Sequence, residues 1–142
     1  MIVLGGYRGL MRAVADAALE RGLRVLMVIP EAYEKDPFPP GSIIVRTGLG
    51  YRERSLVLVR TSDILVSLGG GLGTLFEELI AHSIGIPVLR LVIPGDRLTT
   101  DRLASCFPSG VLDDRLQGKT DYSSNGRELA DKVCSIASST RR

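Results

Sequence analysis

The sequence predicts an α/β protein with a Rossmann-like, three-layer arrangement, in which a mainly parallel sheet carries helices on both faces. Short apolar runs of strand length alternate with longer segments of helical spacing, and two of these runs end directly in glycine-rich turns. Strands that are joined through helices pair in parallel with right-handed crossovers. A chain of 142 residues is long enough to bury one core. We therefore expect a single α/β domain over residues 1–142.

The first half of the chain predicts three strands and two helices. The apolar run at the start is broken by Gly5-Gly6, and the helix that follows keeps its apolar residues at helical spacing until Gly22 ends it. Prolines and Gly41 between residues 31 and 42 predict a loop. The expected elements are strands at 1–4, 23–29 and 42–45 and helices at 8–21 and 51–61.

The second half continues the alternation and then loses its pattern. Gly85 ends the helix that follows the second glycine turn, and Leu129, Val133 and Ile136 form the apolar stripe of the last helix. Residues 107–122 show no clean periodicity. The expected elements are strands at 64–68 and 87–92 and helices at 74–84, 99–104 and 126–137.

The composition argues against several classes of protein. The net charge of +2 comes from 18 basic and 16 acidic residues spread along the chain, which does not indicate a nucleic-acid or membrane surface. The apolar start is too short for a signal peptide and no window reaches transmembrane length, so we expect a cytoplasmic protein. Cys106 and Cys134 lie far apart in the sequence and indicate no metal site. We expect both to be buried thiols, and a single disulfide bridge between them is the alternative.

Residues 63–78, DILVSLGGGLGTLFEE, carry the strongest functional signal. A strand, a glycine turn and a helix start form an anion site, because glycine lets a ligand approach the backbone and the first helical N–H groups point at it. Glu77 adds a carboxylate where a phosphate cradle has no need of one, which indicates chemistry on the ligand. The alternative is structural: Thr74 and Glu77 have the T-x-x-E form of a capping box, and a first-turn glutamate is favoured by the helix dipole.

Three motifs resemble the superfamily of LONELY GUY proteins and molybdenum-cofactor carriers, often labelled "possible lysine decarboxylase". GGYRGLMRAVADAALERG, residues 5–22, is similar to its GGxxGxM segment and the helix after it. GGGLGTLFE, residues 69–77, resembles its PGGxGTxxE signature. In YRERSLVLVRTSD, residues 51–63, Arg54 stands nine residues before Asp63, as in the family. The resemblance implies that residues 1–142 form a single nucleotide-binding α/β domain.

The resemblance also implies a reaction, the cleavage of the N-glycosidic bond of nucleoside 5′-monophosphates into base and ribose 5-phosphate. Glu77 would stabilise the positive charge that develops on the ribose or activate water, and the helix dipole would keep it ionised. Arg54 would bind phosphate or orient Glu77. The implied phosphate- and nucleotide-binding residues are Gly5, Gly6, Gly9, Gly70, Gly71, Gly73 and Thr74. The hydrolysis requires no cofactor.

Two departures from the family pattern favour a second hypothesis, a non-catalytic carrier or sensor of a nucleotide or molybdopterin-type cofactor. Gly69 stands where the hydrolase signature has proline, and the usual first strand–helix unit is absent. Without that unit we expect a site that is more open, completed by a partner subunit, or weakened. Ser55, by contrast, departs from the carrier branch, which has asparagine there. A third hypothesis is a structural subunit whose sheet is completed by another copy. The resemblance implies a homodimer or higher homo-oligomer that takes a small phosphorylated ligand.

Several polar residues have plainer interpretations. Arg54 lies in a charge run that is typical of a solvated helix face, and Glu78 rivals Glu77, being turned by about 100° around the helix. Arg8 and Arg12 are expected to face solvent, and His82 to be a structural or surface residue. Lysine decarboxylation is not expected, because every lysine, Lys35, Lys119 and Lys132, sits in a polar context unlike that of a pyridoxal Schiff base.

Overall fold

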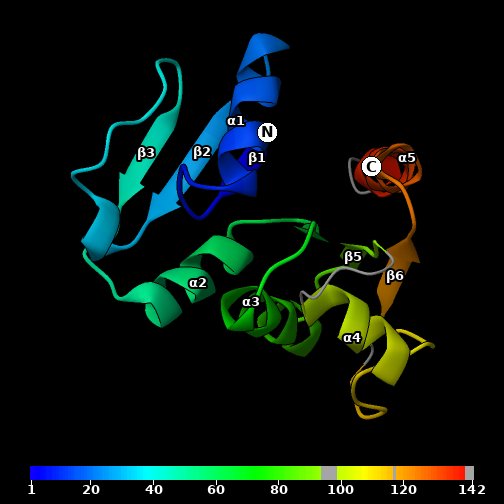
Figure 1. Ribbon diagram of the computed structural model, residues 1–142. Coiled ribbons are helices and arrows are strands. Elements are labelled where there is room, and N and C mark those ends of the chain that lie inside the picture. The colour runs from blue at the N-terminus through cyan, green and yellow to red at the C-terminus, as the bar shows by residue number, and fades with distance from the viewer. Residues whose placement is uncertain (94–98, 117, 140–142) are drawn as a thin grey trace. The chain divides into compact units, whose positions relative to one another are not determined.

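The computed structural model describes residues 1–93, 99–116 and 118–139. The chain divides into two compact units, Met1–Thr61 and Ser62–Arg142, which are described separately. Every strand pairing in each unit is parallel, and helices flank the strands (Figure 1). The predicted α/β class is therefore confirmed. Hydrogen bonds group the strands into two three-stranded sheets, one in each unit. That residues 1–142 act as one nucleotide-binding domain remains a prediction.

The first unit has strand order β1-β2-β3, as in one half of a dinucleotide-binding fold. Val25, Met27 and Ile29 of β2 pack with Ala15 and Ala18 of α1 to form its core. Val28, on the opposite face of β2, is also buried, and α2 packs against this strand. The elements are β1 (Ile2–Leu4), α1 (Leu10–Glu20), β2 (Val25–Ile29), the 3₁₀ turn η1 (Glu31–Tyr33), β3 (Ile43–Arg46) and α2 (Tyr51–Arg60).

The second unit has strand order β4-β5-β6, with β5 in the centre. Helix α3 packs against β4 and β5, and α5 packs against β5 and β6. Val88 and Leu89 of β5 point to opposite faces and are both buried, so the central strand is covered on both sides. The elements are β4 (Leu65–Ser67), α3 (Leu72–Ser83), β5 (Val88–Leu91), α4 (Thr99–Cys106), β6 (Thr120–Ser123) and α5 (Gly126–Ser139).

Several element bounds differ from the sequence expectation by one or two residues, and four differences affect the argument. Helix α3 begins two residues earlier than predicted, at Leu72. The loop after β2 contains the short turn η1. Strand β6 falls in the stretch without periodicity, because its inward side chains include the polar Thr120 and Ser123, which are buried without giving an apolar signal. Both cysteines are free and exposed, so the expectation of buried thiols or a disulfide bridge is wrong.

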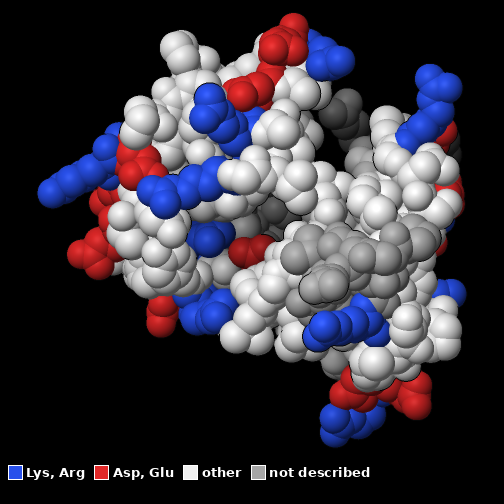
Figure 2. All heavy atoms as spheres, in the orientation of Figure 1, with Lys and Arg blue, Asp and Glu red and all other residues white. Residues whose placement is uncertain are grey.

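The face of the molecule in Figure 2 carries charged side chains of both signs. In the view of Figure 2, basic and acidic side chains are interspersed rather than gathered by sign. Within the described residues, no helix combines the length and apolar character that crossing a membrane requires.

Candidate functional site

The second glycine turn joins β4 to α3 and depends on glycine at two positions. Gly69 and Gly70 have φ values of 123° and 154°, which side-chain-bearing residues rarely adopt. Gly70 also leaves room for the side chain of Thr74: a Cβ at residue 70 would lie 2.9 Å from Thr74 Cβ and would collide with its hydroxyl. The turn is therefore folded tightly against the first residues of its own helix.

The N-terminus of α3 carries no side-chain cap, so the predicted capping box is wrong. Gly71 is the N-cap, and no side chain bonds to the first backbone N–H groups. The helix starts at Leu72, which makes Thr74 its third residue and places Glu77 beyond the first turn. The first N–H groups of a helix have no partner within the helix, so they stay available to an anion. The expectation that the dipole holds Glu77 ionised loses its basis, because the effect falls off within the first turn.

Glu77 and Glu78 have different surroundings. Glu78 is 1% exposed and forms a buried ion pair with Arg90, whose side chain is fully buried on β5. Arg90 Nε donates to Glu78 Oε1 at 3.1 Å, and Arg90 Nη2 donates to Oε2. Glu77 is half-buried on another side of the helix. Glu78 is thus engaged inside the protein, and Glu77 is the carboxylate of this pair that remains at the surface.

Arg90 is an internal residue that the sequence analysis did not single out. Its guanidinium carbon lies 5.5 Å from the centre of the Tyr122 ring, and the Tyr122 hydroxyl donates to the carbonyl of Phe107 at 2.7 Å. The one available signal was a charged residue in the middle of an otherwise apolar strand, VLRLV. A buried charge needs a partner, and Glu78, on the helix before that strand, supplies it.

His82 is a buried structural residue of α3 and not a surface residue; the sequence had left both interpretations open. Its side chain is 3% exposed, and its Nε2 lies 2.8 Å from Thr120 Oγ1 of β6. Burial lowers the pKa of His82 from its ordinary value. The residue therefore joins α3 to the edge strand in its neutral form.

The first glycine turn, between β1 and α1, is shaped by Arg54. This residue is 9% exposed, unlike Arg52, Glu53 and Arg60 on the same helix, so the interpretation of Arg54 as part of a solvated face is wrong. A Cβ at Gly5 would lie 3.0 Å from the guanidinium carbon of Arg54 and would collide with one of its nitrogens. Gly5 therefore makes the space that the guanidinium occupies, at the carboxyl end of β1.

The remaining residues of this turn complete the site in the first unit. Gly6 is buried, and Gly9, with a φ of 54°, is the N-cap of α1 and leaves that helix without a side-chain cap. Arg8 and Arg12 are largely exposed, as expected.

The predicted site residues form two groups. In the first unit Arg54 lies against Gly5, and Gly6 and Gly9 belong to the same turn. In the second unit the turn and the start of α3 hold the other predicted residues, which are Gly70, Gly71, Gly73, Thr74 and Glu77. Asp63 is exposed between α2 and β4. Among the described residues, no group of three or more His, Cys, Asp or Glu side chains could hold a metal ion.

A Rossmann-like α/β protein with two strand–glycine turn–helix sites is the class that these features define. The sequence profile of the SLOG cluster4 family matches residues 1–109. The chain belongs to this family, and the predicted membership of the LONELY GUY-like superfamily is confirmed.

Individual relatives agree with this assignment. The "Probable cytokinin riboside 5'-monophosphate phosphoribohydrolase LOGL1" of Oryza sativa subsp. japonica is 38% identical over 116 residues, 77% of this chain and 51% of that protein. An uncharacterized protein of Archaeoglobus fulgidus is 35% identical over 95 residues, 66% of this chain and 61% of that protein. The chain thus spans about half to three fifths of the length of these relatives. The X-ray structure of TM1055, a structural genomics target, superposes with a TM-score of 0.79 at 30% identity, covering 94% of this chain and 76% of that one.

Proposed function

We propose that the protein binds nucleotides and acts as a nucleoside 5′-monophosphate phosphoribohydrolase, which uses water to release the base and ribose 5-phosphate. One observation carries the proposal: Glu77 stays at the surface of α3, near a helix start without a cap, while Arg90 neutralises the neighbouring Glu78 in the interior. The rice relative, whose name describes this reaction, supports it at the level of the family.

Glu77 would act on the ribose. Cleavage of an N-glycosidic bond leaves the bonding electrons with the base and develops positive charge at the anomeric carbon, as in glycoside hydrolysis. A carboxylate near that carbon stabilises the charge and takes a proton from the attacking water. Capping does not account for Glu77, since no side chain caps α3.

The glycine turns would hold the phosphorylated part of the substrate. Gly70, Gly71, Gly73 and Thr74 would offer backbone and hydroxyl donors at the start of α3. Arg54, with its guanidinium held against Gly5, would bind phosphate with paired donors, and Gly6 and Gly9 would line the turn beside it. The reaction as written needs water and these side chains, and no metal or cofactor.

A carrier or sensor is the second candidate. Gly69, in place of the proline of the hydrolase signature, favours it. In that case the same donors would bind a nucleotide or a molybdopterin-type cofactor as cargo, through its phosphate, and Glu77 would have no chemical role. For either candidate we propose a homodimer or higher oligomer, which light scattering of the purified protein would test.

The deciding experiment incubates the purified protein with a panel of nucleoside 5′-monophosphates and follows free base and ribose 5-phosphate by chromatography. We expect the two products in equal amounts, and a fall in rate of about 10²-fold or more for Glu77→Gln. Glu20→Gln is the matched control, because Glu20 is an exposed glutamate at the end of α1. Release that survives Glu77→Gln would remove Glu77 from the mechanism. No release from any nucleotide, together with nucleotide binding in calorimetry, would favour the carrier.

A further inference from the structure

Helix α2 has one buried and one exposed face. Its buried residues are Arg54, Ser55, Leu58 and Val59. Its exposed residues include the four that we call the α2 stripe, which are Glu53, Leu56, Val57 and Arg60. Their spacing of i, i+3, i+4 and i+7 places all four on one side of the helix. Leu56 and Val57 are 44% and 37% exposed, so the α2 stripe is apolar at its centre and charged at its two ends.

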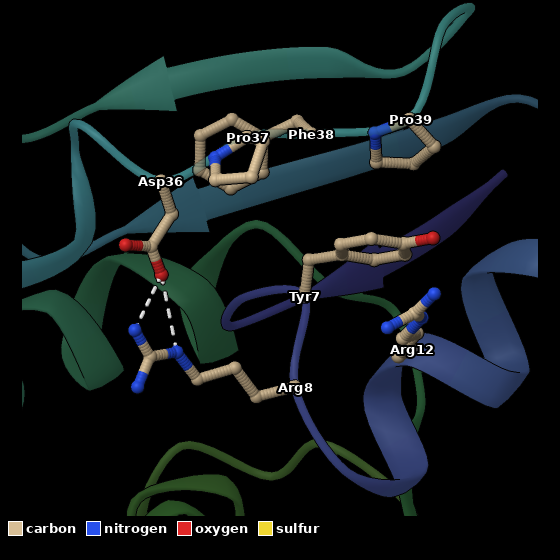
Figure 3. A pocket seen from close by; sticks show the side chains of 7 residues that line it. All are labelled: Tyr7, Arg8, Arg12, Asp36, Pro37, Phe38 and Pro39. Carbon is tan, nitrogen blue, oxygen red and sulfur yellow. Dashed lines mark hydrogen bonds and ion pairs between the residues drawn. The ribbon is translucent and has the colours of Figure 1, made fainter.

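The charged ends of the α2 stripe are not paired within the part of the chain that the structure describes. Beside the first glycine turn Arg8 pairs with Asp36 (Figure 3), but neither Glu53 nor Arg60 takes part in an ion pair there. The two lie about 10 Å apart along the helix, too far to pair with each other. Both charges favour the dipole of α2, so they do not by themselves call for a partner. The exposed apolar pair between them does, because a solvated helix face is ordinarily polar.

The α2 stripe is complementary to a second copy of itself. In a contact with two-fold symmetry, residue i of one copy faces residue j of the other, and j faces i. When two α2 helices lie antiparallel with the axis between Leu56 and Val57, Leu56 faces the partner's Val57. The same axis brings Glu53 next to the partner's Arg60, and Arg60 next to the partner's Glu53, because the midpoint of positions 53 and 60 also falls between 56 and 57. A parallel pair in register would instead place each charge next to its own copy.

The exposed apolar surface of the first unit is not confined to α2. Ile44 of β3 packs with the core that α1 covers, so its neighbours Ile43 and Val45 point to the other face of the sheet. Both are exposed, although their register partners on β2 include the buried Val28. A specific interface buries on the order of 800 Å² of each partner, more than one helix stripe supplies. Ile43 and Val45 are further apolar side chains that a second copy can cover.

We propose that two copies of the chain associate through α2, antiparallel about a two-fold axis between Leu56 and Val57. The occupant is a second copy because the order acidic, apolar, apolar, basic is complementary to its own reverse. Arg54 is on the buried face of the helix and takes no part in the contact. The inference specifies the contact of the homo-oligomer proposed above and requires neither a nucleotide nor turnover. It therefore stands or falls separately from the proposed reaction.

The test is sedimentation velocity of the full chain without ligand, for the wild type, Glu53→Arg and Arg60→Glu. We expect a wild-type dimer with a dissociation constant on the order of micromolar to tens of micromolar, since the contact is small. Either variant places two like-charge pairs across the axis and should weaken self-association by about tenfold or more. An equimolar mixture of the two variants should form a heterodimer with about the wild-type affinity. One copy then carries arginine at both ends of the α2 stripe, and the other carries glutamate at both.

Two further variants separate charge from packing. Glu20→Arg makes the same charge change at the exposed end of α1 and should leave the dimer unchanged. Leu56→Ser removes exposed apolar surface at the axis and should weaken the dimer by about tenfold. Circular dichroism shows that each variant is folded, and recovery in the mixture cannot come from two unfolded proteins.

Three results would overturn the proposal. A wild-type protein that stays monomeric up to millimolar concentration would remove the second copy and leave the α2 stripe to a different protein. A dimer that Glu53→Arg, Arg60→Glu and Leu56→Ser all leave intact would use another face, and the proposed homo-oligomer would survive without this contact. A mixture that stays as weakly associated as its two components would show that positions 53 and 60 do not meet across a two-fold axis.

Discussion

In the first glycine turn, residues 5–9, the space that Gly5 leaves is filled by the guanidinium of Arg54 from α2. In the second, residues 69–73, the space that Gly70 leaves is filled by Thr74 of the helix that follows. Both turns connect a parallel strand to a helix without a side-chain cap. Their backbones therefore offer the same kind of anion site.

The charged side chains near the two turns differ. The first turn has three arginines, of which Arg8 and Arg12 pair with Asp36 and Asp16 while Arg54 lies against Gly5, whereas Glu77 and Glu78 follow the second turn. A strand–glycine turn–helix unit predicts that something anionic binds, and the neighbouring side chains decide what happens to it. An arginine at the first turn suits the binding of a phosphate, and the Glu77 carboxylate after the second turn suits the proposed reaction at the ribose. The interior differs too, because the second unit buries a complete ion pair, Glu78 with Arg90.

The largest loss of stability should come from breaking that buried pair. Arg90→Met leaves the carboxylate of Glu78 buried without a partner and should cost about 3–5 kcal/mol in free energy of unfolding. The double variant Glu78→Met/Arg90→Met should recover most of the loss, because an apolar pair of similar volume needs no desolvation of charge. Urea unfolding measures both. Arg8→Met, which breaks the exposed pair with Asp36 at the first turn, is the comparison and should change stability far less. Equal losses in the single and double variants would show that packing, not charge, accounts for the effect.

Gly70→Ala should have the next largest effect. Alanine at a φ of 154° is strained, and its Cβ would also meet the side chain of Thr74, so we expect a loss of about 1–3 kcal/mol. Gly71→Ala is the comparison, because nothing lies within 4 Å of a Cβ there; as the N-cap with a φ of −104° and a ψ of −142°, it should lose up to about 1 kcal/mol, less than Gly70→Ala. Thermal unfolding of the two proteins gives the comparison. A loss as large in Gly71→Ala would mean that the whole turn, rather than Gly70, resists a side chain.

The sequence predicts the alternation of strands and helices well, because apolar runs and glycine stops are local signals. The same signals predict both glycine turns and the last helix. These signals do not predict strand β6, because its buried residues Thr120 and Ser123 are polar. The sequence also does not predict the start of α3 at Leu72. The T-x-x-E pattern favours an N-cap at Thr74, whereas the N-cap in the structure is Gly71.

The roles of the charged residues depend on contacts between distant parts of the chain. Glu77 and Glu78 are indistinguishable from local sequence, and only the pairing with Arg90 on the next strand separates them. Arg54 lies in a charge run whose other members are exposed, and only its contact with Gly5 shows that it turns inward. The motif resemblance identified Arg54 and Glu77 as candidates without these contacts, and their catalytic roles remain predictions.

Acidic pH should weaken the second unit specifically. Burial lowers the folded-state pKa of His82 below its ordinary value of 6.5. The neutral form is the stable one in the folded protein, so His82 contributes stability above pH 6.5 that is lost as the pH falls through the lowered folded-state pKa. His82 is the only histidine in the chain, which makes the assignment direct. Hydrogen exchange of α3 and β6 amides at pH 7.5 and 5.5 should show faster opening at the lower pH. His82→Gln should remove this pH dependence, and its persistence would assign it to other groups.

Gly5→Ala should cause the smallest change in stability of these variants. It should reduce function nevertheless, so it distinguishes an effect on function from an effect on stability. The φ of Gly5 is not in the left-handed region, so alanine fits the backbone. The new Cβ collides with the far end of a flexible side chain, and the protein can relieve the collision by moving the Arg54 guanidinium. We expect a loss below about 1 kcal/mol, because the backbone at Gly5 stays unstrained and the colliding atoms are the far end of a flexible side chain.

The displaced arginine should nevertheless reduce function. If Arg54 binds phosphate, Gly5→Ala should lower kcat/KM, or nucleotide affinity if the protein is a carrier, by about as much as Arg54→Ala does, on the order of 10²-fold. The double variant Gly5→Ala/Arg54→Ala should be no worse than Arg54→Ala alone, because both changes remove the same contact. Additive losses in this cycle would give Gly5 a role of its own, as a backbone donor at the turn. A stability loss as large as that of Gly70→Ala would mean that the space at Gly5 cannot adjust, and the contrast between the two turns would fail.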